Sequence, residues 1–195
     1  MWKKAEKFLA KDKYLGPLVK KYGPCKIRPS KKGKYFSTLV GAIISQQISS
    51  KAAAAIFSRV KKGLDSKIIP EEILSTSETK FRKWGLSKQK INYLKDLAYK
   101  IERKEIEIKK LDRQTDEEIL KKLVSVKGIG RWTAEMFLMF TLARKDVFPA
   151  DDLGIQKGVS KLFKRNYKIH EIEQISKRWK PFRTAASWYI WKFQD

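Results

Sequence analysis

The sequence contains a short glycine turn that could bind a phosphate group. Gly128 and Gly130 lie between two segments that have the periodicity of amphipathic helices. A tight hairpin between helices requires positive φ, which glycine adopts readily, and backbone N–H groups without a nearby Cβ can approach an anion closely. The second helix is expected to begin near Arg131, where its free N-terminal amides would favour a phosphate oxygen.

Two basic residues, Lys127 and Arg131, flank this turn and add positive charge to it. An ordinary connection between two helices also favours glycine, so the turn by itself fits either interpretation. The neighbouring residues have to decide between them.

Two adjacent carboxylates follow the turn. Asp151 and Asp152 come after Phe148-Pro149, and Asp152 lies 20 residues beyond Trp132. A helix that starts at the tryptophan, followed by a loop that folds back, would bring the two side-chain types together. A carboxylate in a dry pocket can stabilise positive charge that develops during a reaction. Either aspartate could instead serve only as a helix N-cap.

The elements that must position these residues are all predicted to be helices. Thr115-x-x-Glu118 is a capping box, so the first helix of the hairpin should begin there, and the second should run from 131 to about 142. We find no strand-like alternation and no repeat of 20 to 50 residues. Other segments with helical periodicity are 2–22, broken at Gly16-Pro17; 36–60, with a polar break at 45–50; a short helix that opens at Pro70-Glu71-Glu72; 77–84; and 87–101.

The composition indicates a polyanionic partner. The chain has 45 Lys and Arg against 21 Asp and Glu, a net charge of +24, and this charge is spread along the sequence rather than gathered on one amphipathic helix. We therefore expect nucleic acid, and no membrane, as the partner. One cysteine, Cys25, and one histidine, His170, exclude a disulfide, a zinc site and an iron–sulfur cluster. No signal-peptide-like segment is present, so we expect an intracellular protein of the cytoplasm or nucleoid. We also expect it to be monomeric and to require no cofactor.

Four separated blocks of the sequence carry a family resemblance. They are Phe36–Ala54, centred on Ile44-Ser45-Gln46-Gln47-Ile48-Ser49; Val126–Ala134; Asp146–Ile155; and Trp179–Arg183. In this order they resemble the helix-hairpin-helix (HhH-GPD) superfamily of DNA glycosylases, with the best match to the 3-methyladenine DNA glycosylase II type.

The resemblance implies an all-α fold of two helical subdomains with a cleft between them. One subdomain would span residues 34–143 and contain the helix-hairpin-helix motif at about 116–142. The other would combine residues 1–33 with 144–195. Because residues 1–33 are too short for the β-rich N-terminal domain of some family members, no separate β domain is expected.

The resemblance also distinguishes the two carboxylates. Family members place an aliphatic residue three positions after the catalytic aspartate, and Ile155 stands three positions after Asp152. This implies that Asp152 is the catalytic residue and that Asp151 is the helix N-cap.

An aromatic pocket for the base is implied as well. Trp132 occupies the position at which bifunctional relatives carry a catalytic lysine, and an indole cannot form a Schiff base. The resemblance therefore implies a monofunctional hydrolase in which Trp132 stacks on the base. Trp191 matches another aromatic residue of the family's pocket, and Met136 stands where some relatives have an aromatic residue.

Two segments are implied to contact DNA. The polar break at 45–50 would face the minor groove, with Gln47 filling the gap left by an extruded nucleotide, although the sequence alone favours a surface connection. The full set of implied DNA-contacting residues is Lys127, Gly128, Gly130, Arg131, Thr133, Gln46, Gln47 and Ile48. A structural monovalent cation is implied at the hairpin, bound by the backbone carbonyls of Val124, Val126 and Ile129.

The expected function is therefore hydrolysis of alkylated purines from damaged double-stranded DNA, by base flipping, in base excision repair. Two alternatives are a non-enzymatic helix-hairpin-helix DNA-binding module and an oxidised-base glycosylase of the same fold. The module would need neither a carboxylate nor a pocket, so Trp132, Asp152 and Trp191 favour the enzyme. The absent lysine weakens the oxidised-base alternative.

Overall fold

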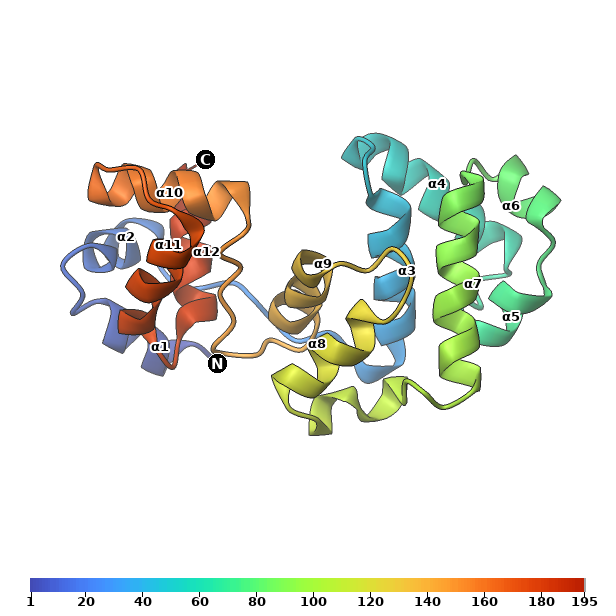
Figure 1. The fold of residues 1–195 in the computed structure, drawn as a ribbon, viewed down its shortest axis with the longest axis horizontal. Helices are drawn as coiled ribbons and strands as arrows, with labels where there is room; N and C mark the ends of the chain where they lie inside the picture. Colours follow the sequence, from blue (N-terminus) through green and yellow to red (C-terminus); the bar gives the residue numbers. More distant parts are fainter. Residues whose placement is uncertain (195) are drawn as a thin grey trace. The chain divides into compact units, whose positions relative to one another are not determined.

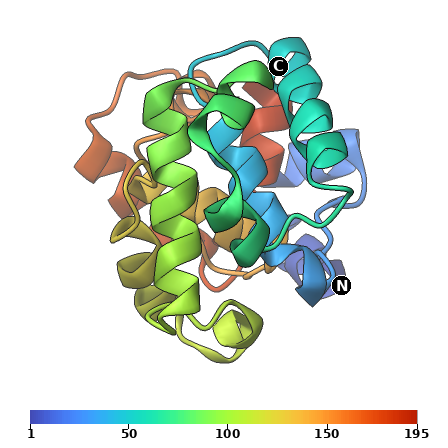
Figure 2. The same ribbon diagram turned by 90° about the vertical axis from the view of Figure 1, so that its right-hand side faces the viewer.

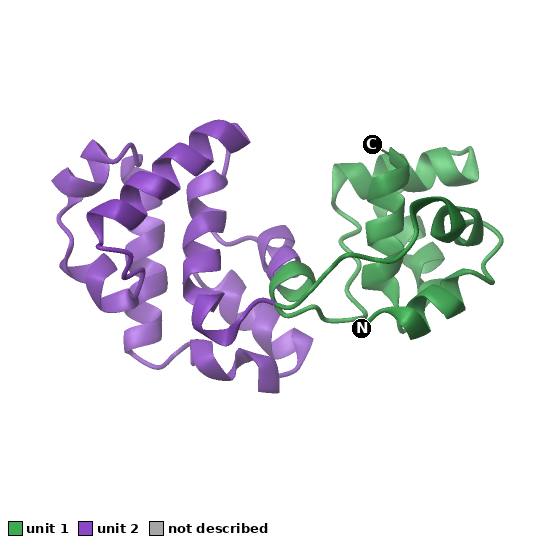
Figure 3. Ribbon diagram, turned by 180° about the vertical axis from the view of Figure 1, so that it is seen from behind, with its two compact units in different colours: residues 1–29, 138–195 green, residues 30–137 purple. Residues whose placement is uncertain are grey.

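The computed structural model describes residues 1–194, and within that range it contains helices and loops but no β-strand (Figure 1). The predicted all-α class is confirmed. The chain forms two compact units, coloured separately in Figure 3. We call Ser30–Phe137 the central unit, and Met1–Pro29 with Leu138–Asp195 the terminal unit. These boundaries lie a few residues before the expected ones at 34 and 143.

The helices of the central unit begin where the sequence provides polar caps. The side chains of Ser49, Ser77 and Ser87 each accept the backbone N–H three residues later, which satisfies one of the free amides of the helix. Thr115 and Glu118 form the predicted capping box. The elements are η1 (Lys32–Lys34), α3 (Tyr35–Ser45), α4 (Ser50–Gly63), α5 (Pro70–Ser75), α6 (Glu78–Lys83), α7 (Lys88–Glu102), η2 (Ile108–Arg113), α8 (Asp116–Val124) and α9 (Arg131–Met136).

Helix α7 organises the core of this unit. Helices α3, α5 and α6 pack against it, and α3 and α7 lie side by side in both Figure 1 and Figure 2. The fully buried aliphatic side chains of these two helices include Leu39, Val40, Ile43 and Ile44 of α3, and Ile91, Leu94 and Leu97 of α7. Each such side chain contributes about 1.5–3 kcal/mol by leaving water. This packing fixes the C-terminal end of α3 beside the first turn of α7.

The terminal unit has its own apolar core, which includes the buried side chains of Trp179 and Tyr189. Helix α12 packs against both α10 and α2. The elements are α1 (Lys3–Leu9), α2 (Leu15–Tyr22), α10 (Leu153–Phe163), α11 (Ile169–Ser176), η4 (Lys177–Trp179) and α12 (Arg183–Gln194), preceded by η3 (Phe137–Thr141), which begins at the last residue of the central unit.

Two local predictions need correction. The break in the first helical segment lies between Leu9 and Leu15, whereas Gly16-Pro17 belongs to the first turn of α2, where the missing N–H of proline removes no helical hydrogen bond. The helix that begins at Arg131 changes at Phe137 into the π-helical turn η3. None of the helices described here is long and apolar enough to span a membrane.

Candidate active site and nucleic-acid interface

The glycine hairpin joins α8 to α9 and needs only one left-handed residue. Gly128 has φ +81°, as the turn requires, and the Ile129 N–H donates to the Val126 carbonyl at 3.0 Å. Gly130 has φ −82° and ψ 173°, which is ordinary extended backbone, and it is the N-cap of α9. Of the two glycines, Gly128 therefore supplies the positive φ that the hairpin requires, and Gly130 does not.

Helix α7 holds the hairpin in place. The Lys127 amide donates to Asp96 Oδ2 at 2.8 Å, and a Cβ on Gly128 would overlap the ring of Tyr93. Gly128 is thus required both by its backbone angle and by the approach of an aromatic ring. Sequence reasoning missed Asp96 and Tyr93, because neither belongs to a local motif.

The polar segment predicted between two helices is the loop Gln46–Ser49, between α3 and α4. Gln47 is exposed and adopts φ +56°, the left-handed region that non-glycine residues seldom occupy, and Ile48 is 37 % exposed. Gln46 is partly buried, and its Nε2 donates to the Gly128 carbonyl at 2.7 Å. The structure therefore joins the loop directly to the hairpin.

Helix α9 presents the predicted aromatic residue to solvent. Trp132 is 49 % exposed, and Met136 lies one turn later on the same helix and is partly buried, as is Thr133. The Arg131 guanidinium is exposed, and its Nε donates to Glu135 Oε1 at 3.0 Å. Since Glu135 is buried, this ion pair fixes the side chain of Arg131 along the helix.

In the terminal unit the carboxylate of Asp152 is held by two donors. Its Oδ1 accepts the Ile155 N–H at 2.9 Å and the Trp191 Nε1–H at 2.8 Å. Asp152 is therefore the N-cap of α10, and the prediction that Asp151 caps this helix is wrong. The helix starts at Leu153, so the capping position is Asp152, and Asp151 is exposed.

The contact between Trp191 and Asp152 depends on a small residue. A Cβ on Gly154 would lie 2.9 Å from Trp191 Cδ1 and 3.0 Å from Asp152 Oδ1, so a larger residue would separate the pair. The rings of Phe140 and Trp191 also pack together, with centroids 5.8 Å apart. These contacts give the indole one orientation toward the carboxylate.

A second ion pair holds the segment that leads to Asp152. Arg183 donates from Nε to Asp146 Oδ1 at 2.7 Å and from Nη2 to Oδ2 at 2.9 Å. The Val147 N–H donates to Thr184 Oγ1 at 3.0 Å. Both contacts tie the segment to the first turn of α12, the helix that carries Trp191. Sequence reasoning included Asp146 and Arg183 in the family blocks without assigning them a role.

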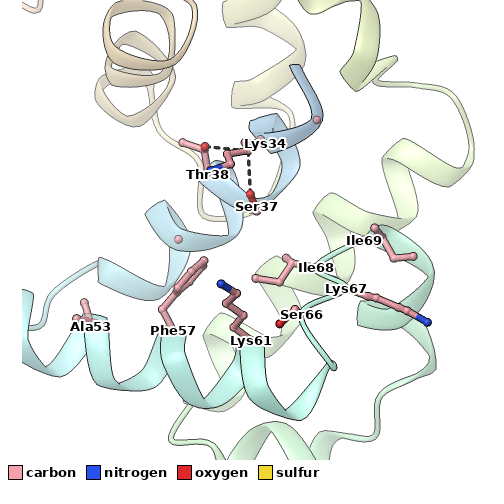
Figure 4. Close-up of a pocket in the computed structure, with 13 residues that line it drawn as sticks. Lys34, Ser37, Thr38, Ala53, Phe57, Lys61, Ser66, Lys67, Ile68 and Ile69 are labelled. Carbon is pink, nitrogen blue, oxygen red and sulfur yellow. Dashed lines mark hydrogen bonds between the residues drawn. The ribbon is translucent and has the colours of Figure 1, made fainter. Parts of the chain in front are cut away.

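Neither the buried thiol of Cys25 nor a surface groove of the central unit involves these residues. Burial raises the pKa of the Cys25 thiol to about 11, so it is protonated and a poor nucleophile at neutral pH. A groove of about 800 Å³ lies between α3, α4 and the segment 66–69, with Phe57 and Lys61 pointing into it (Figure 4). None of the predicted site residues lines this groove.

The predicted residues fall into two sets. Gln46, Gln47, Ile48 and the hairpin share the central unit with Trp132 and Met136, whereas Asp152 and Trp191 share the terminal unit. Each set is assembled from segments far apart in the sequence. The first offers polar backbone and an exposed aromatic residue, and the second offers an oriented carboxylate.

Comparison with known proteins gives consistent matches over nearly the whole chain. Residues 40–183 match the model of the HhH-GPD superfamily of base excision DNA repair proteins. DNA-3-methyladenine glycosylase 1 of Schizosaccharomyces pombe is 41% identical over 186 residues, which are 92% of this chain and 80% of the relative. The alkylbase DNA glycosidase-like protein mag2 of the same organism is 33% identical and covers 98% of this chain and 93% of its own length.

Solved structures agree with the sequence matches. The S. pombe 3-methyladenine DNA glycosylase in complex with abasic DNA is 38% identical, with a TM-score of 0.81, covering 97% of this chain and 95% of that one. A DNA-3-methyladenine glycosidase from Bacillus halodurans is 32% identical with a TM-score of 0.89, covering 98% and 89% of the two chains. The chain therefore belongs to the HhH-GPD superfamily of base excision DNA repair proteins, as a DNA glycosylase of the 3-methyladenine type.

Proposed function

We propose that this protein is a monofunctional glycosylase that hydrolyses the N-glycosidic bond of alkylated purines, such as 3-methyladenine, in duplex DNA. The observation that carries the proposal is the carboxylate of Asp152, which is held at Oδ1 by the Ile155 amide and the Trp191 indole. A carboxylate with a fixed orientation can stabilise positive charge at a sugar without first reorganising water.

In the proposed reaction the bond between C1′ and the base breaks, and the base leaves with the bonding electron pair. An alkylated purine carries a formal positive charge, which this electron pair neutralises, so the base is a good leaving group. The Asp152 carboxylate stabilises the positive charge that develops on the sugar. Water then adds to C1′ and loses a proton, so the products are the free base and an abasic site.

Trp132 provides the stacking surface for the extruded base in this proposal. Its indole is 49 % exposed, so it is accessible to a ligand, and an aromatic face attracts an electron-poor cationic ring. Because position 132 holds no amine, no Schiff base with C1′ forms there and the DNA backbone is not cut.

The central unit supplies the proposed binding surface for damaged double-stranded DNA. The hairpin, with Lys127, Gly128, Gly130, Arg131 and Thr133, contacts a phosphate, and the exposed side chain of Gln47 fills the gap left by the flipped nucleotide with support from Ile48. The related S. pombe enzyme was solved with DNA. We expect the protein to act as a monomer, inside the cell where its substrate lies, and to bind DNA less tightly as salt rises.

A monovalent cation at the hairpin is also part of the proposal. Helix α8 ends at Val124, so the Val124 carbonyl has no partner within the helix, and the Val126 carbonyl keeps a second lone pair beside its bond from the Ile129 N–H. These neutral oxygens, with the carbonyl of Ile129, fit a hard monovalent ion. Bound there, such an ion would tie the end of α8 to the hairpin that contacts DNA.

The proposal is tested by incubating the protein with duplex DNA treated with a methylating agent and identifying the released bases by chromatography. We expect 3-methyladenine and other alkylated purines, with no strand cut before alkali is added. Release of oxidised guanine instead of methylated purines from matched duplexes would contradict the proposed substrate class.

A further inference from the structure

One lysine of α7 connects the two parts of the proposed DNA-binding surface. Lys90 donates from Nζ to the Ile44 carbonyl at 2.7 Å and to the Gln46 carbonyl at 2.8 Å. These oxygens lie at the C-terminal end of α3, where helical carbonyls have no partner within the helix and where positive charge is favourable. Lys90 therefore fixes the point at which the chain leaves α3 and enters the loop.

The next link is the side chain of Gln46. Its Nε2 donates to the Gly128 carbonyl at 2.7 Å, so the residue whose carbonyl is held by Lys90 also contacts the hairpin. The hairpin in turn rests on α7 through the bond from the Lys127 amide to Asp96 and the contact between Gly128 and Tyr93. Loop, hairpin and α7 thus form one closed set of contacts within the central unit.

The conformation of the loop explains why such contacts are needed. Gln47 adopts φ +56°, which costs a non-glycine residue roughly 1–2 kcal/mol and persists only where the surrounding contacts offset that cost. Gln47 is exposed, so its own side chain does not supply that restraint. The restraint comes from the residue before it, through Lys90 and the hairpin, and from the residues after it, where Ser49 caps α4.

We propose that Lys90 and Gln46 are positioning residues that couple the Gln46–Ser49 loop to the hairpin, so that phosphate binding and insertion of Gln47 into the base stack occur as one event. Gln46 then acts inside the protein rather than as a base contact. This inference rests on the proposed function, because it assigns a role to residues that never touch the reacting bond.

A direct phosphate contact by Lys90 is the competing explanation. Lys90 is only partly exposed and burial lowers its pKa, whereas Lys88, at the start of the same helix, is exposed. Two of the three Nζ protons of Lys90 already bond carbonyl oxygens. A bound phosphate would therefore meet Lys88 more readily than Lys90.

The first experiment compares Lys90→Met with Lys88→Met, which removes the same charge from the same helix. On a duplex with one N7-methylguanine, we expect Lys90→Met to lower the single-turnover excision rate by about tenfold or more and Lys88→Met to leave it nearly unchanged. Lys90→Met should lower the affinity for undamaged duplex no more than Lys88→Met does. Lys90→Arg should recover much of the rate, because a guanidinium can donate to both carbonyls.

Gln46→Met tests the second link and keeps the chain length without the donor. It should reproduce the slow excision of Lys90→Met at unchanged affinity for undamaged DNA. Equal excision rates for Lys90→Met and Lys88→Met would contradict the proposed coupling of loop and hairpin. A loss of affinity for undamaged duplex as large as the loss of excision rate in Lys90→Met would contradict it as well.

A double variant separates coupling from a general loss of stability. If Lys90 acts through the loop, Lys90→Met combined with Gln47→Ala should excise within about twofold of the slower single variant, whereas independent effects would multiply. Multiplied losses would overturn the proposal even if all variants melt at the same temperature.

Failure of the coupling and failure of the proposed function give different results. Unstacking can be followed without chemistry, through 2-aminopurine placed beside the lesion, in proteins that also carry Asp152→Asn. A weaker fluorescence rise for Lys90→Met than for Lys88→Met in that background supports the coupling, and equal rises overturn it. Failure of the wild type to release methylated bases would count against the proposed function alone.

Discussion

The central unit and the terminal unit hold their proposed functional groups in different ways. In the central unit, the groups proposed to meet DNA include many backbone atoms, shaped by Gly128 at φ +81° and Gln47 at φ +56° and held by side chains of α7. In the terminal unit, they are the side chains of Asp152 and Trp191, which hydrogen-bond each other at 2.8 Å.

This difference determines how each unit can be damaged by substitution. A side chain can be deleted directly, so changes in the terminal unit should act on the rate of base release. A backbone group cannot be deleted, so the hairpin should be sensitive only where a substitution changes the backbone angle or its support. The following predictions compare deletion of a side chain, which should act on the rate, with distortion of the hairpin backbone, which should act on affinity.

The largest effect is expected from Asp152→Asn. Asparagine can still cap α10 and accept the Ile155 N–H, so folding should be preserved. Loss of the negative charge should lower single-turnover excision by at least about a hundredfold. DNA affinity should stay equal or increase, because the change removes a negative charge that faces a polyanion. Excision, affinity and melting temperature should all be measured on the same preparation.

The matched control is Asp151→Asn, which removes the same charge from an exposed neighbour that caps nothing. It should excise nearly as fast as the wild type. An inactive Asp151→Asn together with an active Asp152→Asn would reverse the assignment of the catalytic carboxylate.

The next effect is expected from Trp132→Lys, which replaces the proposed stacking surface by an amine. Base stacking on an aromatic residue is worth roughly 1–3 kcal/mol, so excision should fall by about tenfold or more. At a position as exposed as this one, the new ammonium should keep its proton and attack no sugar. Borohydride should therefore trap little covalent protein–DNA adduct. Abundant adduct from the variant, or any from the wild type, would contradict a monofunctional enzyme.

A smaller effect, on affinity instead of rate, is expected from Gly128→Ala compared with Gly130→Ala. Alanine at φ +81° is strained by about 1–2 kcal/mol, and its Cβ would displace the Tyr93 ring. Gly130 has φ −82° with open space beside it, so alanine should fit there. We expect about five- to tenfold weaker binding of undamaged duplex for Gly128→Ala and less than twofold for Gly130→Ala. Equal losses would mean that the hairpin's shape does not govern binding.

Sequence patterns predicted those parts of the fold that depend on neighbouring residues. The capping box at Thr115 and Glu118, the loop between α3 and α4 and the positive φ of Gly128 each follow from a few adjacent residues. The break assigned to Gly16-Pro17 failed because proline in a first helical turn does not interrupt hydrogen bonding. The family was recognised from four blocks in the right order, whereas the role of Asp152 in catalysis stays a prediction.

The contacts that connect distant segments could not be predicted in this way. The bond from Lys90 to Ile44 spans 46 residues and that from Gln46 to Gly128 spans 82, and a side chain bonded to a carbonyl leaves no pattern in the sequence. The resemblance assigns catalysis to Asp152, from the aliphatic Ile155 three positions later, and leaves Asp151 as the helix cap. The structure gives the capping position to Asp152, since one carboxylate can bond the helix amide and still face a ligand.

The smallest effect is expected from Trp191→Phe, which tests whether the indole N–H orients Asp152. Phenylalanine keeps an aromatic ring beside Phe140 but cannot donate to Asp152 Oδ1, so one hydrogen bond worth about 1 kcal/mol is lost. Excision should fall a few-fold at unchanged affinity for undamaged DNA. Trp188→Phe is the control, because it removes an indole from the same helix at a residue that packs on Tyr189. If both variants excise at the wild-type rate, the indole N–H does not orient the carboxylate, and Trp191 contributes to packing rather than to the rate.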